Sequence, residues 1–150
     1  SGDAVVGFTT NELVQLQLAG ANPRALPVAA GTVPLVSTCL LTTTAYAKKN
    51  PEVVRQVVQA VASAIEATAA DQPKAIDIAA TQIPGWTAAA RPNAEAVLQA
   101  SIDLMDVHDG TFGPALDATQ WAQMAEFLQS GKLIKTPVTA TDAFTNTFAM

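Results

Sequence analysis

The sequence has little of several residue types on which common binding sites depend. Its 150 residues include one cysteine, Cys39, and one histidine, His108. A single cysteine excludes an internal disulfide and any cluster of metal-binding thiolates, and a single histidine excludes a site with several histidine ligands. We therefore expect neither a metal ion nor a cofactor.

Charge is also scarce. Charged residues make up 14% of the chain, against about 25% in an average soluble domain. The net charge of −5 argues against nucleic-acid binding, which needs a cationic surface to displace counterions from phosphates. It excludes a polybasic membrane-surface protein in the same way. Apolar residues make up 49%, enough for a hydrophobic core, but no run of 18 apolar residues predicts a membrane span.

The first twenty residues predict a strand followed by a helix. The apolar run Ala4–Phe8 has the pattern of a core strand in a parallel or mixed sheet. Asn11 suits a helix N-cap, and Glu12 suits the positive end of a helix dipole. Apolar side chains at helical spacing then lead to Gly20: Leu13, Leu16 and Ala19. A strand this early needs partners on both sides, so we expect the chain to be a piece of something longer.

The remaining sequence predicts two more strands and then helices. The strands are expected over Leu26–Ala30 and Leu35–Thr42, and a short helix over Ala45–Lys49. Asn50-Pro51-Glu52 is a strong helix start. The apolar face of that helix is Val54, Val57, Val58, Val61 and Ile65.

Four further helix signals follow along the chain. Asp71-Gln72-Pro73 opens a helix that Ile83-Pro84-Gly85-Trp86 ends, and Asn93 is expected to cap the next, before a loop at His108-Asp109-Gly110. Asp117 caps a helix that buries Trp121, Met124 and Leu128, with Gly131 as its left-handed terminator. Asp142 is expected to cap a last helix through Phe148.

Most polar residues favour a structural interpretation. His108 is flanked by Asp106 and Asp109, but neighbours in a loop rarely form an acid–base pair, so a solvated histidine is favoured. Cys39 reads as a small core hydrophobe. Trp86 favours packing over a lid. The sequence predicts no catalytic residue.

The polar stretch after the first strand is the exception: Thr9, Thr10, Asn11 and Glu12. In α/β sheets, ligands bind at the carboxyl ends of strands beside the following helix N-terminus. Here two hydroxyls, an amide and a carboxylate would meet a ligand, and Glu12 could accept hydrogen bonds from an amine or aminopyrimidine. The alternative is a plain N-cap with an acid in the first turn, and physics alone does not separate the two.

Three stretches together carry a family resemblance. They are Asp3–Phe8 with Asn11-Glu12, Lys49–Val54 at the start of the long helix, and the tail from Trp121 to Asn146. They are similar to the carboxyl-terminal half of the periplasmic substrate-binding proteins of ABC importers. The nearest branch is the thiamine-pyrimidine-precursor type, with relatives for riboflavin, nitrate, sulfonate and taurine.

The resemblance implies an α/β fold, the carboxyl-terminal part of a type II periplasmic-binding-protein fold, helix-rich with few strands. Residues 1–25 would end the second lobe, residues 26–42 would form the hinge crossover, and residues 43–150 would complete the first lobe with helices. The amino-terminal half of the family would be missing, on the same or a separate chain. The implied ligand contacts are Thr9, Thr10, Asn11 and Glu12.

The function that follows is capture of a small polar or heteroaromatic solute by hinge closure, for delivery to an ABC transporter permease. The location would be periplasmic or extracytoplasmic and membrane-anchored. One alternative is an enzyme of pyrimidine-precursor synthesis, which would need a reactive histidine or a cofactor lysine, and only Lys48 or Lys49 could serve. The other is a helical interaction module that exposes a large apolar patch.

Overall fold

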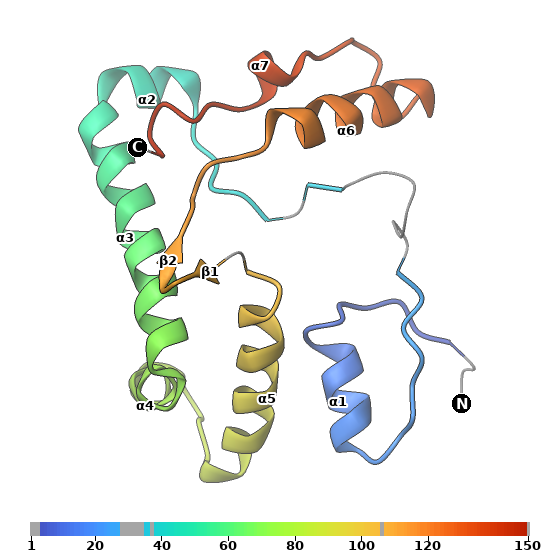
Figure 1. Cartoon of the computed structure of the whole chain (residues 1–150), viewed down its shortest axis with the longest axis vertical. Coiled ribbons are helices and arrows are strands. Elements are labelled where there is room, and N and C mark those ends of the chain that lie inside the picture. Colours follow the sequence, from blue (N-terminus) through green and yellow to red (C-terminus); the bar gives the residue numbers. More distant parts are fainter. Residues whose placement is uncertain (1–3, 28–34, 37, 106, 150) are drawn as a thin grey trace. The chain divides into compact units, whose positions relative to one another are not determined.

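The computed structural model in Figure 1 describes residues 4–27, 35–36, 38–105 and 107–149. The chain divides into two compact units. Unit 1 comprises Ser1–Ala25 and Ser63–Phe112, and unit 2 comprises Leu26–Ala62 and Gly113–Met150. Helices dominate both units, as the sequence predicts. The lobe and hinge boundaries implied by the resemblance remain predictions.

Unit 1 begins with helix α1, Glu12–Leu18, which packs against helix α5. The helix ends where the sequence predicts, because Gly20 has a φ of 81°, a left-handed conformation that glycine adopts without strain. Leu13, one of the three apolar residues predicted at helical spacing, is half-buried. Val14 is the buried side chain of α1, whereas Leu16 is exposed.

Helices α4 (Gln72–Gln82) and α5 (Arg91–Ile102) pack against each other in unit 1. The Asp71 side chain caps α4 by accepting a hydrogen bond from the Lys74 N–H at 3.1 Å, and Ile76 is buried. The expected cap at Asn93 is wrong, because α5 already starts at Arg91. A 3₁₀ turn, η1 (Ala88–Ala90), leads into α5. The first turn of α5 contains a proline, which suits a helix start.

A small hairpin follows α5, where the sequence predicts a loop. Strand β1 (Val107–His108) pairs antiparallel with β2 (Thr111–Phe112). Between them Asp109 and Gly110 have φ angles of 50° and 78°. An Asp-Gly pair with positive φ at both residues is the signature of a two-residue hairpin turn, and it was the signal available in the sequence.

Unit 2 contains α2 (Thr44–Lys49), α6 (Ala118–Ser130) and α7 (Ala140–Ala143), and α3 (Pro51–Ala70) runs from unit 2 into unit 1. Thr43 caps α2, and Asp117 caps α6 by accepting from the N–H groups of Thr119 and Gln120. These starts confirm the sequence prediction. Figure 1 shows α7 lying along α6, and the two pack together.

Two helix-end predictions in unit 2 are wrong. Gly131 has a φ of −74°, and the left-handed residue is the next one, Lys132, at 56°. The last helix starts one turn before the predicted position, with Thr139 as its N-cap and Asp142 inside it. Asp142 instead accepts a hydrogen bond from the Thr139 hydroxyl at 2.6 Å, so it supports the helix start from within.

The predicted strands are absent from the described residues. Neither Ala4–Phe8 nor the described part of Leu35–Thr42 forms a strand, so Cys39 does not lie in one. For Leu26–Ala30, residues 28–30 lie outside the described residues. A strand exists only where another strand supplies hydrogen bonds, and the two described strands of this chain pair with each other.

Few side chains are fully enclosed. Among the described residues the buried hydrophobic side chains are Val14 and Ile76, both in unit 1. On α3, Val54, Val58 and Ile65 are half-buried, but Val57 is 50% and Val61 37% exposed, against the expected single core face. None of the described helices combines the length and apolar character that crossing a membrane requires.

Candidate functional site

The candidate site lies at the turn that leads into α1. The Phe8 carbonyl accepts hydrogen bonds from the N–H of Asn11 at 3.1 Å and of Leu13 at 3.5 Å. These bonds bend the chain through Thr9 and Thr10 and start the helix at Glu12. The four residues predicted from the sequence therefore lie together on one turn, with Thr9 exposed and the other three half-buried.

The Glu12 carboxylate folds back over this turn. Its Oε2 accepts the Phe8 N–H at 2.6 Å, and its Oε1 accepts from the Asn11 Nδ2 at 3.1 Å. The Asn11 Oδ1 in turn accepts from the Gln15 side-chain amide at 2.7 Å. Asn11 is the N-cap residue, yet its side chain makes no capping bond. The expected cap by the Asn11 side chain is therefore absent, and the Glu12 carboxylate instead accepts a hydrogen bond from the N–H of Phe8, four residues earlier.

These contacts favour the ionised form of Glu12. The hydrogen bond from the Phe8 N–H, followed by that from the N–H of Glu12 itself, holds the pKa of this carboxyl below its ordinary value, against a smaller opposing effect of burial. A carboxylate has acceptor capacity for about four hydrogen bonds. Oε1 and Oε2 therefore retain acceptor positions for a donor from a ligand.

Sequence reasoning missed two residues of this turn. A Cβ built on Gly7 would lie 2.6–2.7 Å from the Glu12 side chain, so only glycine leaves room for the folded-back carboxylate. Gln15 holds Asn11 from one helical turn further on. The signal for Gly7 was a glycine inside an apolar strand pattern, which indicates close approach of another group.

The remaining sequence candidates do not gather into a second site. His108 lies in β1, and Asp106 and the His108 side chain fall outside the described residues. Cys39 is half-buried. Lys48 and Lys49 end α2, and both residues are exposed. Within the described ranges, no three His, Cys, Asp or Glu side chains converge as a metal site would require.

The aromatic residues of the tail serve packing. Trp121 on α6 stacks on Phe144, with ring centroids 5.3 Å apart and an interplanar angle of 24°. Asn146, two residues after Phe144, makes two hydrogen bonds with the backbone of Leu116. Its Oδ1 accepts from the Leu116 N–H at 2.8 Å, and its Nδ2 donates to the Leu116 carbonyl at 2.9 Å. The tail that carried part of the family resemblance therefore packs on α6 through Phe144 and binds the backbone of Leu116 through Asn146.

Comparison with known proteins agrees with that resemblance. The sequence model of the family described as NMT1/THI5 like matches residues 1–75, half of the chain. The riboflavin-binding protein RibY of Chloroflexus aurantiacus is 29% identical over 145 residues. That alignment covers 95% of this chain and 41% of RibY, so the chain spans about two fifths of the length of its curated relative. No solved structure matches the chain significantly.

The matched residues 1–75 include the turn at Phe8–Glu12 and the start of α3, two of the three stretches on which the resemblance depends. The helix-rich structure, in which the described strands are two residues each, is consistent with part of a periplasmic-binding-protein fold, the fold of this family. The chain belongs to the NMT1/THI5-like family, and the predicted relationship to substrate-binding proteins of that type is confirmed.

Proposed function

We propose that the chain is part of a solute-binding protein that captures a small heteroaromatic ligand. The observation that carries this proposal is the alignment of 95% of the chain with a riboflavin-binding protein. Riboflavin and the thiamine pyrimidine precursor both contain a pyrimidine-type ring with polar nitrogen and oxygen or amino groups. Such a ring needs hydrogen-bond acceptors and donors side by side, which Glu12 and Asn11 offer on one turn.

In this proposal Thr9, Thr10, Asn11 and Glu12 contact the ligand. Residues 1–25 belong to one lobe, residues 26–42 cross to the other, and residues 43–150 help to complete it. Ligand binding shifts an open–closed equilibrium because the closed state makes more contacts with the ligand. The partners are an ABC transporter permease and the polypeptide that completes the two lobes, and the protein acts outside the cytoplasm.

Binding without chemistry is favoured over enzymatic pyrimidine synthesis. The lysines considered for a cofactor link, Lys48 and Lys49, are exposed at the end of a six-residue helix. A cofactor lysine needs a desolvated pocket that lowers its pKa. Exposed lysines of this kind do not favour the enzymatic alternative.

The proposal is tested by titrating riboflavin into the complete protein purified from its natural source and following quenching of flavin fluorescence. A parallel calorimetric titration uses the aminopyrimidine precursor of thiamine. We expect saturable binding of one of them at micromolar concentration or below. Failure of both to bind at millimolar concentration would contradict the proposed ligand class.

The site is tested by Glu12→Gln, with Glu126→Gln on the exposed side of α6 as the matched control. Replacing the carboxylate with an amide removes one acceptor oxygen, so we expect a tenfold or greater loss of affinity for Glu12→Gln alone. Equal affinities for wild type and Glu12→Gln would remove Glu12 from the site.

A further inference from the structure

One hydrogen bond in unit 2 has a sulfur atom as its acceptor. The backbone N–H of Val36 donates to the Sδ of Met124 on α6 at 3.3 Å, across 88 positions of the sequence. Both residues are half-buried, and both belong to unit 2. A thioether is a weak acceptor in comparison with a carbonyl or carboxylate oxygen. A chemical change at this sulfur is therefore sufficient to break the bond.

The other side chains that bind distant backbone in unit 2 do not share this sensitivity. Asn146 binds Leu116 through its amide. Arg55 donates to the Thr147 carbonyl through its guanidinium. Amides and guanidinium groups are inert to mild oxidants, whereas the thioether of methionine is oxidised to a sulfoxide that reductases convert back. Among these contacts, the one at Met124 is the contact that a reversible covalent modification can control.

We propose that Met124 is a site of reversible oxidation by peroxides, and that its oxidation releases the Val36 N–H from α6. A lone pair of the sulfur attacks the terminal oxygen of the peroxide, so that an S–O bond forms and the O–O bond breaks. The proton of the transferred oxygen moves to the departing oxygen, which leaves as water or as an alcohol. The sulfur loses two electrons and becomes a sulfoxide, and the peroxide is reduced by the same two electrons.

The present geometry does not accommodate the sulfoxide. An oxygen placed between the nitrogen and the sulfur would need about 2.7–3.2 Å to the nitrogen for a normal hydrogen bond. The length of the S–O bond adds to this, so the sulfur would have to retreat from its present 3.3 Å. An oxygen on the other side of the sulfur leaves a partial positive charge facing the N–H. The bond between Val36 and the Met124 sulfur is lost in both cases.

Met105 provides a comparison within the same chain. It follows α5 in unit 1, and its side chain is 39% exposed. Among the described residues, its sulfur accepts no hydrogen bond. Peroxide therefore reaches Met105 readily but breaks no such bond there. A response of Val36 that depends on Met124 and not on Met105 is specific to the contact.

The consequence for ligand binding rests on the proposed function. Val36 lies within residues 26–42, which that proposal assigns to the crossing between the lobes. A loosened segment must be ordered again when the lobes close, and this costs conformational entropy, so oxidation lowers the affinity for the ligand. The oxidation of Met124 and the release of Val36 do not depend on this step.

The experiment is amide hydrogen exchange at Val36 in the complete protein before and after treatment with hydrogen peroxide, with fragmentation in the mass spectrometer to resolve single residues. We expect exchange at Val36 to become about tenfold faster once Met124 has gained an oxygen, because one hydrogen bond is lost. A sulfoxide reductase should restore the original rate. Unchanged exchange with Met124 oxidised would overturn the proposal. Met124 that stays reduced after Met105 is fully oxidised would overturn it as well.

Met124→Leu and Met105→Leu are the matched variants. Leucine approximates the volume and apolar character of methionine, but it offers no acceptor and does not react with peroxide. We expect Met124→Leu to exchange fast at Val36 with and without peroxide, and Met105→Leu to respond as wild type does. Slow exchange in Met124→Leu, or a peroxide response that persists in it, would refute the proposal. Circular dichroism checks that both variants are folded.

A separate titration distinguishes this proposal from the proposed function. We expect the oxidised wild type and oxidised Met105→Leu to bind riboflavin or the thiamine precursor severalfold more weakly than their reduced forms. Equal affinities before and after oxidation would refute the link to lobe closure. A protein that shows the Val36 response but binds neither ligand would refute the proposed function and leave Met124 as the oxidation site.

Discussion

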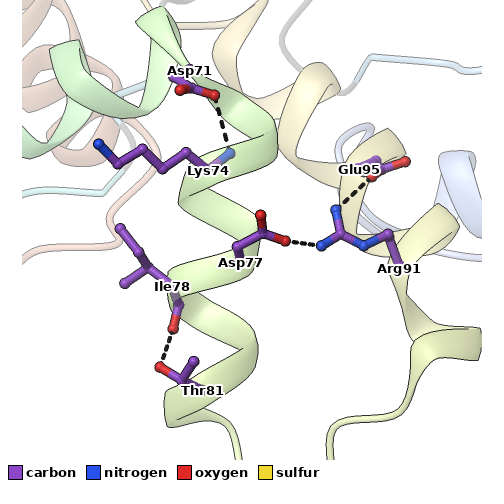
Figure 2. Close-up of polar contacts among 7 residues, drawn as sticks. All are labelled: Asp71, Lys74, Asp77, Ile78, Thr81, Arg91 and Glu95. Atoms are coloured by element: carbon purple, nitrogen blue, oxygen red, sulfur yellow. Dashed lines mark hydrogen bonds and ion pairs between the residues drawn. The ribbon is translucent and has the colours of Figure 1, made fainter.

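The two units of the chain are stabilised by different kinds of contact. Unit 1 contains both buried hydrophobic side chains of the described residues, and its helices α4 and α5 are joined by side-chain pairs. Figure 2 shows Arg91 on α5 reaching Asp77 on α4 and Glu95 one turn along its own helix. Unit 2 has no fully buried hydrophobic side chain among its described residues.

Unit 2 has side chains that bind the main chain of distant segments. Asn146 binds Leu116, Arg55 on α3 donates to the Thr147 carbonyl at 3.4 Å, and the Val36 N–H donates to the Met124 sulfur at 3.3 Å. Contacts of this kind fix one geometry but bury little apolar area. The difference teaches that unit 1 encloses two hydrophobic side chains, whereas the hydrophobic side chains described in unit 2 are at most half-buried and are accompanied by directional bonds and a stacked aromatic pair.

The largest expected effect comes from Val58→Asp on α3, with Val57→Asp as its matched control. Val58 is half-buried and Val57 is 50% exposed on the same helix. A carboxylate at Val58 loses hydration on folding, so we expect a loss of roughly 3 kcal/mol or more and unfolding of the chain. Thermal denaturation followed by circular dichroism measures this. Similar melting of both variants would show that the assigned register of α3 is wrong.

Asn146→Ala tests the directional bonds of unit 2. The substitution removes both hydrogen bonds to Leu116 and leaves its N–H and carbonyl without that partner. We expect a loss of about 1–2 kcal/mol in chemical denaturation. Asn93→Ala, at an exposed position inside α5, is the control and should leave stability unchanged or slightly higher. No difference between the two variants would remove Asn146 from the account of unit 2.

Arg91→Gln tests the side-chain pairs of unit 1. Glu95, and then Asp77, raise the pKa of Arg91, so the guanidinium remains charged. The partners are 50% and 65% exposed, and water and salt screen such pairs. We expect a small decrease in melting temperature at low ionic strength that disappears at 1 M salt. A decrease that persists in salt would mean that packing of the arginine stem, not its charge, carries the effect.

The smallest effect concerns Glu12 and pH. Because the pKa of Glu12 is lowered in the folded chain, its contribution to stability is present above the unfolded-state pKa of about 4.3 and is lost as pH falls through the folded-state value. The melting temperature of Glu12→Gln should therefore lie below that of wild type at pH 7 and approach it in acid. A constant difference across that range would exclude the hydrogen bond to the Phe8 N–H as its cause.

The sequence predicted which residues form the candidate site but not how their side chains and backbone are arranged. Residue types and spacing indicated the turn at Thr9–Glu12 and its place before a helix. They did not show that Glu12 binds the Phe8 N–H or that Gly7 must lack a Cβ, because both facts depend on how the backbone folds over itself. The contact between α1 and α5 joins residues about eighty positions apart, which no local pattern specifies.

Local chemistry in the sequence determined where three of the described helices begin, namely α2, α4 and α6. Thr43, Asp71 and Asp117 supply oxygens to backbone N–H groups within the next three residues, so their effect needs no distant partner. Strands and buried faces need distant partners, and there the tertiary structure decided. Ala4–Phe8 has the composition of a strand but forms none, since hydrogen bonds from neighbouring strands, not composition, make a strand. Val14 rather than Leu16 is buried on α1 because only the packed neighbour selects which side of a helix is inside.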